Sequence, residues 1–195
     1  MTLHVSLRLL RSLSAIGVAV ALSAGSAVAA CPEAELDASR QSALIDLIQK
    51  APDAQSARPH NAALWQLWTE APDAHAQDLL DSGMKRIRVG NLRGAIAALD
   101  ALVEYCPDYA EGYNQRAFAR YLGQHYAQAI EDLDAALALN PRHVGALSGK
   151  ALSLIGIGEY REALTALEAA LELNPHLSER SLLPKLEERL GAEEL

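Results

Sequence analysis

Aromatic residues are scarce in this sequence: one Phe, two Trp and six Tyr make up 5% of its 195 residues. A core therefore has to be built from Ala, Leu, Ile and Val, a composition typical of closely packed helices. Half of the residues are hydrophobic and 22% are charged, which excludes a disordered polyelectrolyte. The composition predicts a folded, helix-rich chain with a sizeable buried core.

Basic residues are also few. Lys and Arg total 17 against 25 Asp and Glu, which gives a net charge of −8. Nucleic-acid binding needs clustered basic side chains that release the counterions of the phosphates. The acidic balance therefore argues against a nucleic-acid partner.

Catalytic signatures are absent from the sequence. The six His residues include no pair at i, i+4, and there is no HExxH, GxSxG or phosphate-loop motif. His143 and His176 lie in successive loops, where we interpret them as solvated histidines rather than as ligands of a shared metal. We therefore expect no catalytic residue, no metal site and no cofactor.

Residues 1–30 have the features of a targeting segment. Arg8 and Arg11 precede an apolar run at 13–22, and small residues then lead to Cys31. Because the run is too short to span a bilayer, this order of features predicts a secretory signal peptide. We therefore expect an exported, periplasmic protein of a bacterial cell envelope.

Only two cysteines are present, Cys31 and Cys106, and no C-x-x-C pair supports a zinc or redox site. An even pair in an exported protein favours one disulfide, which would close a loop of 106 − 31 = 75 residues. The alternative is acylation of Cys31, since Val28-Ala29-Ala30-Cys31 resembles a bacterial lipobox. The protein would contact a membrane only in this second case.

A repeat of 34 residues is visible in the second half of the chain. Three prolines fall into phase at this shift: Pro107, Pro141 and Pro175. Four further columns agree with them: Gly83, Ala117 and Ala151; Leu92, Tyr126 and Tyr160; Ala95, Ala129 and Ala163; Leu99, Leu133 and Leu167. Small and large residues at fixed offsets with this period are typical of a helix-turn-helix solenoid.

The pattern resembles the tetratricopeptide repeat. The third copy matches best, with Ala151, Gly158, Tyr160, Ala163, Leu167, Ala170 and Pro175. In the second copy Gly123 sits one place early, and in the first Leu92 replaces the turn aromatic. The resemblance implies an all-α, right-handed α-solenoid of three repeats at 73–107, 108–141 and 142–176, in which the first helix of each repeat lines a concave face.

Two further segments flank the repeats. Residues 31–72 are expected to form a helix over 33–51, a linker over 52–59 and a helix over 61–71. Trp65 and Trp68 of this last helix are expected to pack against the first repeat, the alternative being a platform that stacks on a ligand. The inward side of the first helix is expected to carry Leu36, Ala43, Leu44, Leu47 and Ile48. Residues 177–195 are expected to form a capping helix that Ser181 starts and Gly191 ends. Asp108 and Glu111 have the spacing of a capping box.

The candidate binding site is the concave groove. Three columns fall on one face of the first helices: Leu80, Asn114 and Ser148; Met84, Phe118 and Leu152; Ile87, Tyr121 and Ile155. A bare apolar strip of this kind is rare in monomers, so we expect a partner, the chain's own N-terminal helix or neighbouring repeats to cover it. The Lys, Arg and Asn clamp by which some family members hold chaperone carboxylates is absent, because Leu80, Met84, Gln115, Gly145 and Gly149 stand in its place.

The function that these observations favour is a non-catalytic protein-protein interaction module of the cell envelope, which binds a peptide or helix of a partner protein in the groove. The alternative is a structural lipoprotein anchored through Cys31, with its groove filled by its own N-terminal segment. The sequence indicates neither the partner's identity nor the oligomeric state.

Overall fold

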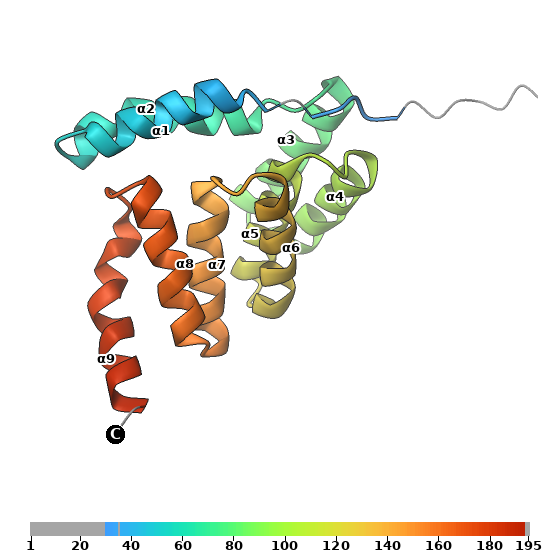
Figure 1. Cartoon of the computed structure of the whole chain (residues 1–195). Helices are drawn as coiled ribbons and strands as arrows, with labels where there is room; N and C mark the ends of the chain where they lie inside the picture. The colour runs from blue at the N-terminus through green and yellow to red at the C-terminus, as the bar shows by residue number, and fades with distance from the viewer. Residues whose placement is uncertain (1–29, 35, 194–195) are drawn as a thin grey trace, which may run out of the picture.

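A computed structural model describes residues 30–34 and 36–193 of the chain (Figure 1). The predicted signal peptide, apart from Ala30, lies outside these residues. Within them all regular structure is helical, so the predicted all-α class is confirmed. The helices are α1 (Ala38–Lys50), α2 (Ala54–Thr69), α3 (Ala74–Arg88), α4 (Leu92–Tyr105), α5 (Ala110–Leu122), α6 (Tyr126–Leu139), α7 (Val144–Ile157), α8 (Tyr160–Leu173), η1 (Ser178–Leu182) and α9 (Leu183–Glu193).

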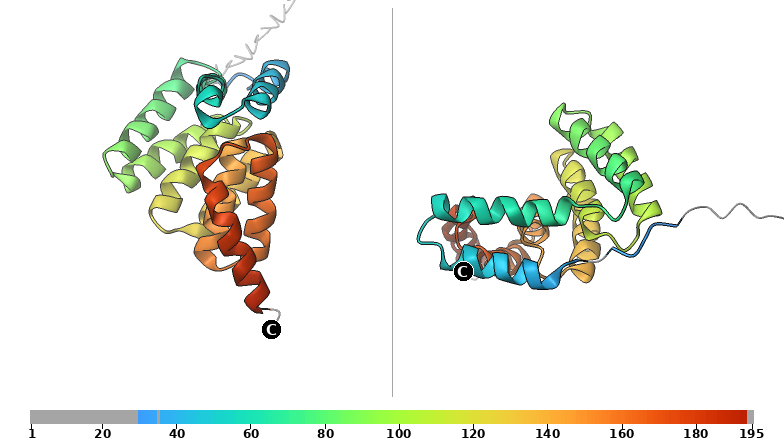
Figure 2. Two further views of the ribbon diagram at one scale, coloured as in Figure 1. Left: turned by 90° about the vertical axis from the view of Figure 1, so that its left-hand side faces the viewer. Right: turned by 90° about the horizontal axis from the view of Figure 1, so that it is seen from above.

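Three antiparallel helix pairs stack side by side: α3 with α4, α5 with α6, and α7 with α8 (Figures 1 and 2). Each pair contacts its neighbours, and α9 covers the outer side of α8. The buried side chains form separate clusters along the stack instead of one central core. This arrangement is that of a solenoid, in which each repeat is stabilised by the next.

Small residues allow these helices to lie close together. A Cβ placed on Gly83 would lie 2.6 Å from Leu99 Cγ, and one on Gly156 would lie 2.7 Å from the ring of Tyr126. Ala117 and Ala151, the counterparts of Gly83, are buried as well. The sequence column of small residues therefore marks the contact between paired helices.

The turn inside each repeat contains one residue in the left-handed conformation. These residues are Gly90, Gln124 and Gly158, with φ of 73°, 61° and 86°, and they are spaced by 34 positions (90, 124, 158). Gly123 has a φ of −81°. The second repeat therefore keeps the turn geometry but places a glutamine where the other two repeats have glycine.

The α1–α2 hairpin lies crosswise over one edge of the stack, where the turns between repeats are found (Figures 1 and 2). The predicted linker over 52–59 is wrong, because α2 begins at Ala54. Asp53 caps it by accepting from Ser56 N at 2.8 Å. Pro59 lies inside α2, where its fixed φ suits the helix and only one backbone hydrogen bond is lost.

The buried face of α1 also differs from the predicted one. Gln41, Ile45 and Ile48 are buried and Leu44 is half-buried, whereas Leu36, Ala43 and Leu47 are exposed. The hairpin docks on turns that offer polar side chains, and one of the three buried residues of α1, Gln41, is polar and bonds to Asn140. A search for apolar periodicity could not identify that face.

The chain's C-terminal helices cover the last repeat. Ser181 lies within η1 instead of capping a helix, and α9 continues past Gly191 to Glu193. Leu186 and Leu190 of α9 are buried against α8, as expected of a cap. Among the described residues, no helix is long and apolar enough to cross a bilayer.

Candidate functional site

The concave face of the stack holds a groove with a volume of about 790 Å³. Its floor comes from α3, α5 and α7, one wall comes from α2, and the chain after α8 bounds its far end. Most of the lining is apolar, and Phe118 and Trp65 are 46% and 40% exposed. An apolar cleft of this size is a candidate docking surface.

Seven of the nine side chains predicted for the groove line it. They are Met84, Ile87, Asn114, Phe118, Tyr121, Ser148 and Leu152. The remaining two do not. Leu80 is fully buried among the side chains of α3 and α4, and Ile155 packs against the cluster that α7, α8 and α9 form. Helix α9 closes the last repeat, and Ile155 is partly buried beside the cluster to which Leu186 of α9 belongs.

The wall that α2 provides was not predicted. Trp65 and Trp68 both belong to the lining, but Trp68 is buried, with its indole stacked on the imidazole of His143 at a centroid distance of 4.0 Å. The prediction that both tryptophans pack against the first repeat is therefore wrong. None of the lining residues belongs to α1, and α2 borders the groove without occupying it. The described residues thus disagree with a groove filled by the N-terminal segment.

The residue before each aligned proline fixes the N-terminal segment to the stack. These residues are Cys106, Asn140 and Asn174, at intervals of 34. Cys106 forms a disulfide with Cys31, Asn140 Nδ2 donates to Gln41 Oε1 at 2.8 Å, and Asn174 Nδ2 donates to Asn61 Oδ1 at 2.9 Å. Each turn that follows the second helix of a repeat is therefore bonded to the N-terminal segment. The alignment of the prolines was the signal that could have identified this column.

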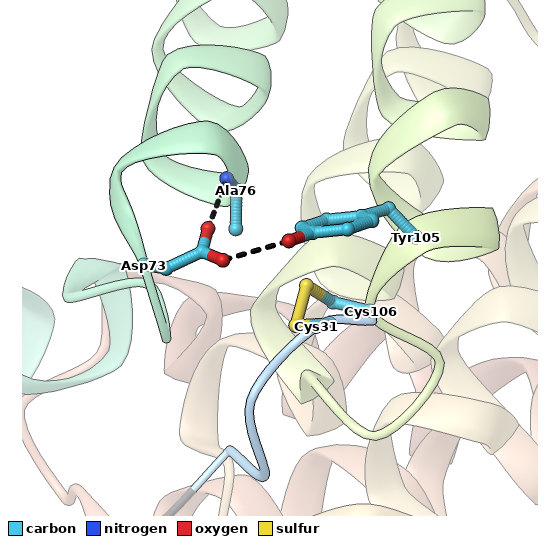
Figure 3. Close-up of a disulfide and its surroundings, with 5 residues drawn as sticks. All are labelled: Cys31, Asp73, Ala76, Tyr105 and Cys106. Atoms are coloured by element: carbon cyan, nitrogen blue, oxygen red, sulfur yellow. Dashed lines mark hydrogen bonds between the residues drawn. A yellow bond between two sulfur atoms is a disulfide. The ribbon is translucent and has the colours of Figure 1, made fainter. Parts of the chain in front are cut away.

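The disulfide between Cys31 and Cys106 joins the segment to the turn after α4 (Figure 3). The predicted pairing is present, and its Cα atoms lie 5.2 Å apart. No free cysteine remains among the described residues. A sulfur in a disulfide is unavailable for acylation, so the lipoprotein alternative finds no support here.

Beside the disulfide, Asp73 links α3 to α4 (Figure 3). Its carboxylate accepts from Ala76 N and from Tyr105 OH, both at 2.8 Å. These hydrogen bonds, the one from Ala76 first, hold the pKa of Asp73 below its ordinary value. The bond to Asp73 in turn raises the pKa of the Tyr105 hydroxyl.

A buried polar pair lies beneath the hairpin. His143 Nε2 is 2.8 Å from Glu111 Oε2, and the two side chains are 0% and 1% exposed. Since His143 Nδ1 accepts from Ala146 N at 3.1 Å, the ring donates through Nε2 to the Glu111 carboxylate. The predicted capping box is wrong, because Tyr109 precedes α5 without a side-chain cap and Glu111 faces His143.

The two loop histidines have separate structural roles. His176 donates from Nε2 to Ala51 O at 3.0 Å, and His143 caps α7. The expectation that both are solvated is wrong, since His143 is fully buried and His176 is half-buried. No group of three His, Cys, Asp or Glu side chains could hold a metal ion in the part of the chain that the structure describes.

Comparisons with known proteins agree with the repeat geometry. A family model for the tetratricopeptide repeat matches residues 123–182, from the end of α5 to η1. A TPR repeat-containing protein of Rhizobium etli is 33% identical over 82 residues, which are 42% of this chain and 40% of that protein. The chain thus spans about two fifths of the length of the curated relatives it matches.

Two solved structures show the same fold. The first TPR of Spaghetti (RPAP3), bound to the HSP90 peptide SRMEEVD, has a TM-score of 0.59 and 26% identity, over 60% of this chain and 94% of that one. The first TPR domain of human RPAP3 has the same TM-score and identity, over 62% of this chain and 95% of that one. The stacked helix pairs, the 34-residue register and these matches lead to one conclusion: the repeats have the fold of tetratricopeptide-repeat domains, and residues 123–182 match the model of that family.

Proposed function

We propose that this protein is a non-catalytic interaction module that binds a segment of a partner protein in its groove. The observation that carries the proposal is the exposure of large apolar side chains in a concave site, above all Phe118 and Trp65. A similar domain, the first TPR of Spaghetti, is bound to an HSP90 peptide in its solved structure. Peptide binding by a 26% identical relative supports the same class of activity here.

The compartment of the proposed function is the cell envelope. Disulfides persist in oxidising compartments and are rare in the cytosol, and Cys31 is paired with Cys106. The signal-like features of residues 1–30 point to the same compartment. Export is tested by expressing the full chain and measuring the mass of the protein in the periplasmic fraction, where cleavage near residue 30 and the loss of two hydrogens are expected. A cytosolic, uncleaved and reduced protein contradicts this part of the proposal.

Binding is tested by selecting displayed random peptides on the purified, oxidised protein. Phe118→Ala removes the most exposed aromatic side chain of the groove and is expected to weaken the selected peptides about tenfold or more. Leu47→Ala is the matched control, because Leu47 is also 46% exposed but lies on α1 outside the groove. Tryptophan fluorescence reports occupancy of the groove, because the two tryptophans of the chain, Trp65 and Trp68, both belong to its lining.

The outcome separates a binding surface from ordinary core. Leu80→Ala is expected to lower the free energy of unfolding by about 3 kcal/mol, because Leu80 is fully buried, whereas Phe118→Ala lowers it by less than about 1 kcal/mol. If Phe118→Ala unfolds the protein, or if every selected peptide binds equally well to the variant, the groove is not the site and the proposal is wrong.

A further inference from the structure

Three polar side chains of the groove floor are engaged inside the protein, whereas Ser153 Oγ, also in the lining, is buried and has no hydrogen-bond partner among the described residues. Asn114 Nδ2 and Gln115 Nε2 both donate to the Glu111 carboxylate, at 3.1 and 2.6 Å, and Ser148 Oγ donates to Glu179 Oε1 at 3.1 Å. These three side chains are less than 8% exposed. An extended peptide needs partners for its backbone N–H and C=O groups, and this floor offers few of them.

An α-helix has no such requirement, because its backbone groups bond to one another. What a helix needs from a groove is apolar surface for one face. Phe118 provides it from the floor and Trp65 from the wall, and Met84 and Leu152 lie in the lining on the neighbouring repeats. Leu122, one turn beyond Phe118, is 43% exposed and extends the apolar surface beyond the groove lining.

The groove also has a charge of opposite sign at each end. Arg88, at the end of α3, lines the groove in the first repeat, and Glu179 lines it after the third. Neither side chain has an ion-pair partner among the described residues. A helix that docks with its N-terminus at Glu179 and its C-terminus at Arg88 places each end of its dipole beside the opposite charge.

We propose that the occupant of the groove is an amphipathic α-helix of a partner protein, docked with its N-terminus toward Glu179 and its C-terminus toward Arg88. The inference rests on the proposed function and specifies its ligand class. The partner helix carries apolar residues at i, i+3, i+4 and i+7, which face Phe118 and Trp65. Its opposite face is polar and remains in water.

The peptides selected on the oxidised protein test this inference. We expect them to show helical apolar spacing and to gain helicity on binding, measured as the difference in circular dichroism between the complex and its components. A proline in the middle of such a peptide is expected to weaken binding about a hundredfold. A serine at the same position is the control, because it interrupts the apolar pattern without breaking the helix.

The orientation is tested with a nitroxide label on either end of a selected peptide. An N-terminal label is expected to broaden the amide signals around Glu179, and a C-terminal label those around Arg88. Arg88→Glu and Glu179→Lys are each expected to weaken binding about two- to fivefold. The reverse broadening pattern contradicts the orientation.

The two hypotheses fail in different ways. If the selected peptides depend on Phe118 but tolerate proline and gain no helicity, the proposal of a helical ligand is wrong. The proposal of an interaction module then still stands. A selection that yields no peptide dependent on Phe118 overturns both.

Discussion

Gln41 and Asn140 exchange two side-chain hydrogen bonds, of 3.1 and 2.8 Å, although 99 residues separate them. Both residues are buried, and Trp68 Nε1 donates to the same Gln41 Oε1 at 2.7 Å. This amide pair fixes the α1–α2 hairpin to the middle turn of the stack. The hairpin in turn carries the Trp65 wall of the groove.

Replacing Asn140 by Ala is expected to lower the free energy of unfolding by about 2 kcal/mol, because Gln41 Nε2 loses its acceptor and Gln41 Oε1 keeps only the bond from Trp68 Nε1. Urea unfolding followed by circular dichroism measures the change. Gln128→Ala, at an exposed helical position, is the control and is expected to stay within about 0.5 kcal/mol of the parent protein. Equal losses in the two variants would show that the amide pair contributes nothing.

Reduction of the Cys31–Cys106 disulfide is expected to lower the free energy of unfolding by up to about 4 kcal/mol, since the bond closes a 75-residue loop in the unfolded chain. The measurement is urea unfolding with and without dithiothreitol. The double variant Cys31→Ser, Cys106→Ser is expected to unfold like the reduced protein and to show no response to the reductant. A response in the double variant would mean that dithiothreitol acts elsewhere.

His143→Ala is expected to lower the free energy of unfolding by about 3 kcal/mol. The variant removes the cap of α7 and leaves the buried Glu111 carboxylate with one donor fewer. His125→Ala is the matched control, because His125 also precedes a helix but its side chain is exposed and makes no capping bond. A loss of similar size at His125 would refute the importance of the buried pair.

The hydrogen bonds to the Asp73 carboxylate are expected to make the free energy of unfolding depend on pH. Its pKa in the folded state is below the ordinary value of 3.8, so the unfolded chain takes up a proton first as the pH falls. Above pH 3.8 the Asp73 carboxylate therefore makes its full contribution to the free energy of unfolding. This contribution is lost as the pH falls toward the folded-state pKa. Asp73→Asn keeps the cap but does not titrate, so its free energy of unfolding should fall less steeply between about pH 5 and 3. Parallel curves for the two proteins would contradict the prediction.

Gln124→Gly is expected to raise the free energy of unfolding by about 0.5–1 kcal/mol, because the position has a φ of 61° and glycine adopts this conformation without a steric penalty. The reverse change, Gly158→Gln, is expected to be destabilising at the equivalent turn of the third repeat, where φ is 86°. Thermal unfolding of both variants measures the effect. A stabilising Gly158→Gln would show that the turn geometry adapts to its residue.

The repeats could be predicted from the sequence because their contacts are local. Gly83 meets Leu99 only sixteen residues further along the chain, and Gly156 lies against Tyr126 of the preceding repeat. Such contacts recur at a fixed period, so self-alignment reveals them. The groove followed from the same register, which placed Met84, Phe118 and Leu152 in one column and in one lining.

The hairpin could not be predicted in this way. Its partners lie far off in the sequence, as Gln41 and Asn140 do, and its buried face is partly polar. Glu111 likewise matched a local capping motif, but a buried bond to His143, 32 residues away, was more favourable than the cap. A local sequence pattern therefore predicts neither the buried face of the hairpin nor the bond between Glu111 and His143.

The sequence by itself determined the helix pairs, their 34-residue register and the apolar columns of the first helices. Helix periodicity and small-residue contacts depend on residues that are close together in the chain. Only the tertiary structure decided that Leu80 is core, that Ile155 packs against the cluster of the last repeat, that Trp65 forms a wall of the groove and that three successive turns hold the N-terminal segment. These features depend on how distant surfaces meet. Which side chains are buried where two such surfaces pack together depends on the shape and the hydrogen bonds of both surfaces.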